Sequence, residues 1–114
     1  MDKKIESDIL IIGAGPVGLF TVFEAGLLGL KCQIIDNLDK VGGQCTELYP
    51  DKPIFDIPGV PSQTATEHIE ALLEQIEPFD YGLHLNSRVN EIHQIDSKEE
   101  IKKWKVITSE EDEF

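Results

Sequence analysis

The sequence predicts an α/β fold built on a strand, a helix and a second strand, joined as a βαβ unit with a parallel sheet. Three observations support this. An apolar run at residues 9–12 enters a glycine-rich turn, an apolar helical pattern follows it, and a second β-rich run at residues 31–35 is followed by an acidic residue. Strands that alternate with helical segments in this way are typical of parallel sheets with crossover helices.

The glycine-rich turn has the pattern Gly-x-Gly-x-x-Gly at Gly13, Gly15 and Gly18. Gly13 permits a tight turn, Gly15 permits the backbone to approach a pyrophosphate, and Gly18 lets the helix pack against the first strand. A phosphate at the helix N-terminus would meet free N–H groups and the positive end of the helix dipole. Asp36 lies near the ~20-residue offset at which an acidic residue binds a ribose hydroxyl. The turn is therefore predicted to bind a dinucleotide.

Composition limits the other possibilities. The 114 residues predict one domain at most, and the formal net charge of −12 disfavours nucleic acid or an anionic membrane as a partner, because phosphates would be repelled. The two cysteines, Cys32 and Cys45, are too few for a disulfide framework and have no metal-ligand spacing, and we expect Cys32 to be buried. We expect no metal site. The chain has no pattern of a signal peptide or a transmembrane span, so a cytoplasmic location is expected.

The first helix is expected from about residue 16 to about residue 28, with Gly29 as its stop. Its broad apolar surface includes Val17, Phe20 and Leu27, and we expect this surface to be covered on more than one side. Residues 41–61 are rich in Gly and Pro, and we expect them to form one long, ordered loop that contacts a ligand.

The second half of the chain predicts one helix and a hairpin. Residues 64–67, Thr-Ala-Thr-Glu, form a capping-box sequence, and apolar residues at i, i+3, i+4 and i+7 follow, so an amphipathic helix is expected to end before Pro78. Residues 83–95 are strand-like, and residues 104–108 alternate as a further strand. We expect these two stretches to pair, with the polar residues 96–103 as their connection.

Several of these motifs together resemble a known family. The order of GAGPVGL at residues 13–19, then Asp36, then a loop closing on DIPGVP at residues 56–61 is similar to the N-terminal FAD-binding segment of thioredoxin-reductase-like flavoproteins. The block GGQCTELYPDKPIFD at residues 42–56 most closely resembles the ferredoxin–NADP reductases of the thioredoxin-reductase type. The resemblance covers essentially the whole chain.

This resemblance implies a Rossmann-like FAD-binding fold with FAD at the first dinucleotide site. Asp36 would hold the adenosine ribose, the backbone at Val89 would meet the adenine, and Tyr49 would lie on the flavin ring. The remaining residues implied to contact FAD are those of the pyrophosphate turn, Gly13, Ala14, Gly15, Pro16 and Gly18, together with Gly43 and the flavin-contacting Gln44. No residue of the chain is assigned a catalytic role.

The resemblance also implies an activity for the complete enzyme. NADPH would give a hydride to FAD, and FAD would pass electrons to ferredoxin or a similar iron–sulfur protein. Residues 1–114 would be a partial FAD-binding domain, inactive alone, without the NADPH-binding domain and the C-terminal FAD segment. The complete enzyme is expected to be a homodimer.

Alternative interpretations are a thioredoxin-reductase-like flavoprotein, an aromatic-ring hydroxylase and a non-catalytic remnant. The hydroxylases often begin with the same GAGPVGL turn, but they usually place an arginine after the ribose acid, where this chain has Asn37. The disulfide reductases that resemble glutathione reductase have a second cysteine where this chain has Pro50, so Cys45 has no partner for a redox disulfide.

Overall fold

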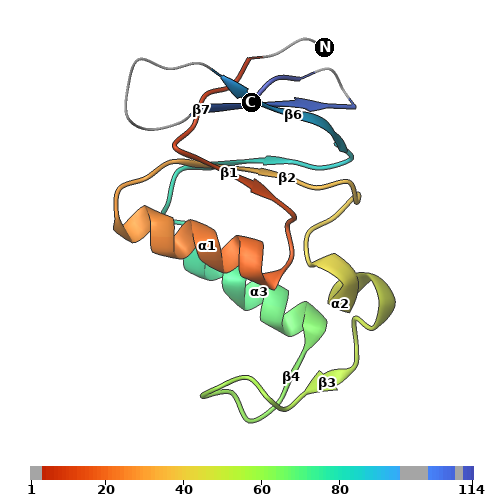
Figure 1. The fold of residues 1–114 in the computed structure, drawn as a ribbon. Helices are drawn as coiled ribbons and strands as arrows, with labels where there is room; N and C mark the ends of the chain where they lie inside the picture. The colour runs from red at the N-terminus through yellow and green to blue at the C-terminus, as the bar shows by residue number, and fades with distance from the viewer. Residues whose placement is uncertain (1–3, 96–102, 110–111) are drawn as a thin grey trace.

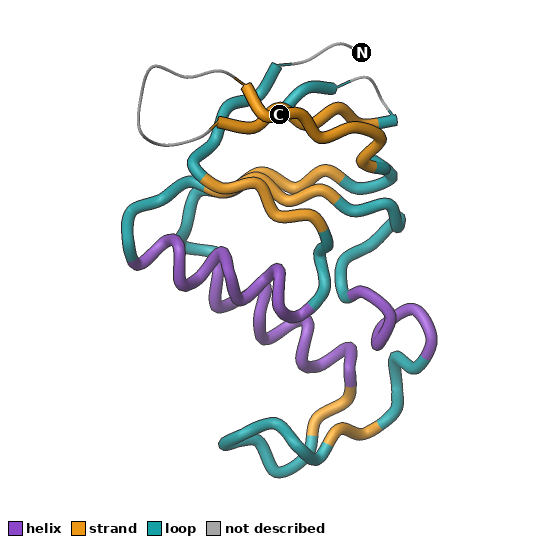
Figure 2. Tube along the Cα trace, viewed as in Figure 1, coloured by secondary structure: helices purple, strands orange, loops and turns teal. Residues whose placement is uncertain are grey.

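A parallel three-stranded sheet forms the middle layer of the computed structural model, which describes residues 4–95, 103–109 and 112–114. Two helices lie against one face of this sheet, and an antiparallel hairpin lies on the opposite side (Figure 1). Figure 2 shows the same three layers by type of secondary structure, with the sheet between the helices and the hairpin.

The sheet has the strand order β1 (Ile9–Ile12), β2 (Cys32–Ile35), β5 (Tyr81–His84), and both pairings are parallel. The central strand is the most deeply buried, with Cys32, Ile34 and Ile35 almost inaccessible to solvent. A strand covered on both faces requires apolar residues at successive positions, which Ile34 and Ile35 supply. The predicted βαβ unit and the burial of Cys32 are confirmed.

Helices α1 (Pro16–Leu27) and α3 (Ala65–Ile76) pack against each other and against the same face of the sheet (Figure 2). The bounds of α1 agree with the sequence prediction, and Gly29 leaves the helix with φ +75°. The expectation that α1 is covered on more than one side was wrong for the described part of the chain. Val17 is 82% exposed and Leu27 is 62% exposed, because the sheet and α3 cover only the face that carries Leu19 and Val22.

Strands β6 (Val89–Ile95) and β7 (Lys103–Thr108) form the predicted hairpin. The inclusion of Leu83 in that hairpin was wrong, because this residue lies in β5 and pairs with β2. The chain leaves β5 through Asn86, at φ +52°, before it enters β6. The apolar pattern of a strand does not show which strand it pairs with. The single strand predicted over residues 83–95 is two strands in the structure, β5 and β6. Residues 96–102 of the predicted connection lie outside the described residues.

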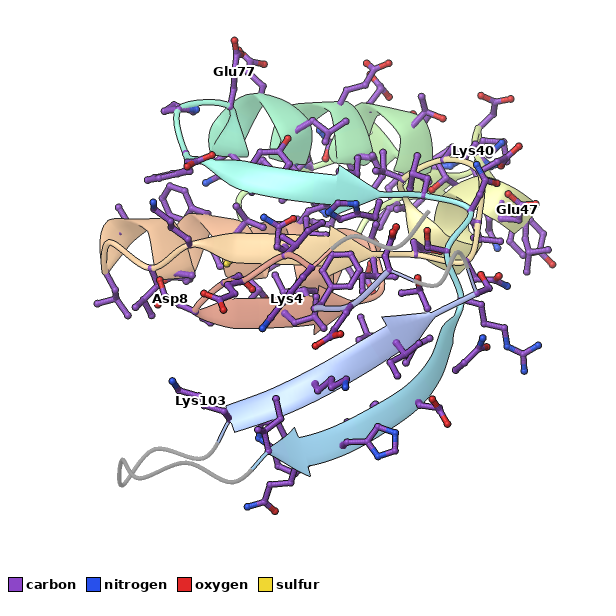
Figure 3. The ribbon with its side chains drawn as sticks, turned by 90° about the horizontal axis from the view of Figure 1, so that it is seen from above. Lys4, Asp8, Lys40, Glu47, Glu77 and Lys103 are labelled. Atoms are coloured by element: carbon purple, nitrogen blue, oxygen red, sulfur yellow. The ribbon has the colours of Figure 1, made fainter. Side chains whose placement is uncertain are left out.

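Residues 41–61 do not form one loop, so that prediction was also wrong. They include α2 (Gly43–Leu48) and β3 (Pro53–Ile54), and β3 pairs with β4 (Gln63–Thr64). After Gly43, the residues of α2 contain no Gly or Pro to interrupt a helix. Lys40, just before this segment, and Glu47 of α2 lie side by side (Figure 3), with Lys40 Nζ 3.9 Å from Glu47 Oε2.

The capping box at the start of α3 is formed as predicted. Thr64 Oγ1 accepts a hydrogen bond from the Glu67 N–H at 3.1 Å, and the Thr64 N–H donates to Glu67 Oε1 at 2.9 Å. These bonds satisfy two backbone donors at the start of the helix. The helix ends at Ile76, before Pro78, which confirms the predicted end.

We expect Thr64→Ala to lower the free energy of unfolding by about 1 kcal/mol, because it removes the side-chain acceptor of the N-cap. Thr64→Ser keeps that acceptor and should retain most of the stability. Urea unfolding followed by circular dichroism measures the difference. Equal losses in the two variants would show that the methyl group, and not the cap, stabilises the helix.

The backbone and then the side-chain hydrogen bonds of Thr64 lower the pKa of Glu67. The carboxylate therefore stabilises the fold at pH values above its unfolded pKa of about 4.3, and this contribution is lost as the pH falls through the lower folded pKa. We expect the difference in unfolding free energy between the unaltered chain and Glu67→Gln to shrink as the solution is acidified. Parallel stability curves from neutral to acidic pH would contradict this assignment.

Candidate dinucleotide-binding site

A cleft of about 370 Å³ lies at the carboxyl ends of β1 and β2. Gly13, which follows β1, and Asp36, which follows β2, line this cleft together with Val89 at the start of β6. Open α/β sheets bind ligands outside the carboxyl ends of their strands. Three of the residues predicted to bind a dinucleotide therefore lie in one cleft at the edge where such a ligand is expected.

The Asp36 carboxylate is held in place by two backbone N–H groups. Ala14 N–H donates to Oδ2 at 2.7 Å, and Leu38 N–H donates to Oδ1 at 2.8 Å. Each carboxylate oxygen has a further lone pair that can accept from another donor. The two backbone bonds fix the orientation of this carboxylate, and they leave acceptor capacity for a vicinal pair of hydroxyl groups.

The glycine-rich turn requires glycine at two positions. Gly13 has φ +116°, and its N–H donates to the Ile35 carbonyl oxygen at 2.8 Å. A Cβ at Gly18 would overlap the Gly13 carbonyl oxygen and would lie 3.2 Å from Ile11 Cγ2. The turn and the close contact between helix and strand are thus both present, as the sequence predicts.

The N-terminus of α1 is suited to an anion. Gly15 is the N-cap residue and Pro16 is the first helical residue; no side chain of the described chain caps this end, and its first turn contains no acidic residue. The first backbone N–H groups of a helix have no partner within the helix, and the helix dipole favours negative charge there. Ala14 is fully buried and its N–H is bound to Asp36, so it contributes by orienting that carboxylate.

A second glycine turn lies against the first. Gly42 N–H donates to the Ala14 carbonyl oxygen at 2.8 Å, and a Cβ at Gly43, which has φ +65°, would lie 3.2 Å from the Gly15 Cα. Thr46 in α2 packs on Gly42, and the buried Thr46 Oγ1 has no hydrogen-bond partner among the described residues. Gly43 is therefore beside Gly15. Gln44 is the second residue of α2, and its side chain lies outside the described residues.

Tyr49 lies at a different hollow. A cavity of about 420 Å³ is lined by Tyr49 and by side chains of the following residues, including Lys52, Ile54 and Phe55. Tyr49 is 61% exposed, and Lys52 Nζ lies 5.4 Å from the centroid of its ring. Tyr49 directly follows α2, which begins at Gly43. The turn at Gly42 and Gly43, which touches Gly15, therefore leads along the chain through α2 to the cavity at Tyr49.

Five further residues that were not predicted as site residues line the first cleft: the apolar Ile12 and Ile35, and the polar Asn37, Ser87 and Arg88. Ser87 N–H donates to the Asp36 carbonyl oxygen at 2.9 Å, which holds this segment beside the end of β2. Asn37 directly follows Asp36, and Ser87 and Arg88 directly precede Val89, so their positions in the sequence could have indicated a place in the site. Their residue types alone do not distinguish them from other polar residues on the surface.

The described residues contain neither a metal-binding cluster nor a membrane-spanning helix. No three His, Cys, Asp or Glu side chains there come together in a way that could hold a metal ion. Nor does any helix in those residues have the length and apolar character to cross a bilayer. Burial, followed by the negative charge of Asp8, raises the pKa of the Cys32 thiol, which keeps it in the unreactive protonated form.

We expect Gly18→Ala to destabilise the chain by about 1–3 kcal/mol, the usual cost of overpacking, since the added methyl group overlaps the Gly13 carbonyl. Thr21→Ala is the matched control on the same helix, because the Thr21 hydroxyl bonds to the Val17 carbonyl oxygen and not to the strand. Chemical denaturation of both variants measures the effect. A Gly18→Ala variant as stable as the control would contradict the close packing.

Comparison with known proteins agrees with the motifs. No family model matches the sequence. The chain is 64% identical over 90 residues to a ferredoxin–NADP reductase of Paraburkholderia xenovorans, which is 79% of this chain and 26% of that protein. It is 54% identical over 110 residues to a ferredoxin–NADP reductase of Pelagibacter ubique, which is 96% of this chain and 31% of that protein. The chain thus spans about a quarter to a third of the length of these relatives.

Solved structures have the same fold. Thioredoxin reductase from Lactococcus lactis superposes with a TM-score of 0.76 at 24% identity, over 96% of this chain and 32% of that structure. Thioredoxin reductase from Streptococcus pyogenes superposes with a TM-score of 0.75 at 25% identity, over 90% of this chain and 30% of that structure. The predicted resemblance is therefore confirmed: the chain is similar in sequence to part of the ferredoxin–NADP reductases, and it has the Rossmann-like α/β fold of thioredoxin reductases.

Proposed function

We propose that this chain is the FAD-binding part of a ferredoxin–NADP reductase, an enzyme that moves electrons between NADPH and ferredoxin through FAD. One observation carries the proposal. Gly13, Asp36 and Val89 line a single cleft, in a chain that is 54–64% identical to proteins of that name. Thioredoxin reductases share the fold at lower identity, which favours the ferredoxin–NADP reductases as the functional relatives.

The cleft and the adjacent helix fit the adenosine diphosphate half of FAD. The Asp36 carboxylate, oriented by Ala14 and Leu38, would accept hydrogen bonds from the two ribose hydroxyls. The uncapped N-terminus of α1 would stabilise the pyrophosphate, with Gly15 and Pro16 at the point of closest approach. Val89 would form an apolar wall for the adenine. No basic side chain is needed, because the helix N-terminus supplies the donors.

The second turn and the second hollow fit the flavin half. Gly43 lies beside Gly15, so a dinucleotide could pass from the first turn toward α2, whose second residue is Gln44. Tyr49 would stack on the flavin ring and shield one of its faces, a contact worth about 1 kcal/mol between aromatic rings. The bound flavin would supply hydride and single-electron chemistry, and the residues of this chain would hold and orient it.

The rest of a ferredoxin–NADP reductase would supply the NADPH site and further flavin contacts, because the chain spans about a quarter to a third of its relatives. We propose ferredoxin or a similar iron–sulfur protein as the electron partner of the whole enzyme. The homodimer and the cytoplasmic location stay predictions made from the sequence.

The proposal is tested by titrating the purified chain with ADP and with FAD, using calorimetry and the flavin absorption retained after desalting. We expect Asp36→Ala to weaken ADP binding about tenfold or more, since it removes charge-assisted hydrogen bonds worth about 1.5–3 kcal/mol. Asp39→Ala removes an equal charge at an exposed position outside the cleft and should bind as the unaltered chain does. Absence of binding, or equal losses in the two variants, would overturn the proposal.

A further inference from the structure

We propose that Arg88 is an adenine-binding residue, whose guanidinium stacks on the purine of the nucleotide held in the cleft. This inference rests on the proposed function, because it requires that the cleft take the adenosine end of a dinucleotide. The motifs assign Val89 to the adenine and assign nothing to its neighbour.

The backbone of Arg88 is fixed at the wall of the cleft. Its N–H donates to Ser109 Oγ at 3.0 Å, and its carbonyl oxygen accepts from the Ser109 N–H at 2.7 Å. The preceding residue, Ser87, donates its N–H to the Asp36 carbonyl oxygen at 2.9 Å. Arg88 is thus held between the end of β7 and the residue that would bind the ribose.

The side chain of Arg88 is available for a ligand. It is exposed, and Arg88 is the only arginine in a sequence with 22 acidic residues. Even so, no carboxylate of the described chain forms an ion pair with it, whereas Lys40 and Lys105 each pair with a glutamate. An unpaired arginine that lines a cleft in so acidic a chain is placed to meet a ligand.

Its position points to the base rather than to the phosphates. The pyrophosphate end of the site is at Gly13 and the N-terminus of α1, and Asp36 follows at the ribose, so the base lies beyond Asp36, toward Val89. A planar guanidinium stacks well on an aromatic ring, and its attraction for the ring is partly electrostatic. A ribose 2′-phosphate would be repelled by the Asp36 carboxylate, so Arg88 is not assigned to that group.

The β-bulge between Val89 and Glu91 supports this geometry. The bulge interrupts the pairing of β6 with β7 at the residue that follows Arg88. Bulges of this kind redirect side chains and are common beside binding sites. The purine would then lie against the segment of Arg88 and Val89, with the guanidinium of Arg88 stacked on it.

Nuclear magnetic resonance titrations of the full chain test the inference, with the amide signals of Gly13 and Asp36 as reporters. The ligands are ADP and ribose 5-phosphate, which lacks the base. We expect Arg88→Ala to weaken ADP binding about fivefold, as for a strong cation–π contact at an exposed site, and to leave the weaker binding of ribose 5-phosphate unchanged. Arg88→Lys keeps the charge without the planar group and should give an intermediate affinity for ADP.

Lys31→Ala is the matched control. It also removes one positive charge, but it lies at the opposite end of β2, before Cys32, and should change neither affinity. Circular dichroism confirms that each variant is folded.

Unchanged ADP affinity in Arg88→Ala would overturn the inference while the proposed function stands. Equal losses for ADP and ribose 5-phosphate would also overturn it, because the contact would then be with phosphate. Tighter binding of 2′,5′-ADP than of ADP, lost in Arg88→Ala, would assign Arg88 to a 2′-phosphate instead. If the unaltered chain bound no ADP, both the inference and the proposed function would fail.

Discussion

The close approach of α1 to the end of β1 is the packing constraint from which the rest of the arrangement follows. A side chain at Gly18 would overlap the Gly13 carbonyl oxygen, so only glycine lets the helix lie this near the strand. At this separation, Leu19 and Val22 reach the core and the helix N-terminus lies beside the cleft. The same contact therefore stabilises the fold and positions the donors that a pyrophosphate needs.

In the proposed function, a strongly acidic chain binds an anionic ligand. With a net charge of −12, the long-range field of this chain repels phosphates, and local dipoles have to offset that repulsion. Backbone N–H groups at the uncapped start of α1 provide them without any basic side chain. In the proposed arrangement, Asp36 would place its negative charge where the ligand offers hydroxyl donors instead of phosphate, and Arg88, which also lines the cleft, would meet the base.

Several predictions that depend on residues close together in the sequence were confirmed, whereas some that depend on contacts between distant segments failed. The bounds of α1, the end of β2 just before Asp36 and the capping box of Thr64 and Glu67 depend on residues a few positions apart, and these predictions were confirmed. The assignment of Leu83 to the hairpin failed because its partner, Ile34, is distant in the sequence. The short helix at Gly43 was missed because flanking glycines and prolines obscured a sequence able to form a single short helix.

The sequence by itself determined the βαβ unit, its glycine turn and the acid at the end of the second strand, since spacing and residue type specify local backbone geometry. Only the tertiary structure decided that Val89 and Arg88 lie at the same cleft as Asp36, and that Tyr49 lies at a separate hollow. The placement of Val89 and Arg88 depends on the parallel pairing of β5 with β2 and on the hydrogen bond from the Ser87 N–H to the Asp36 carbonyl oxygen. Such contacts join segments far apart in the chain, and local preferences do not encode which segments meet.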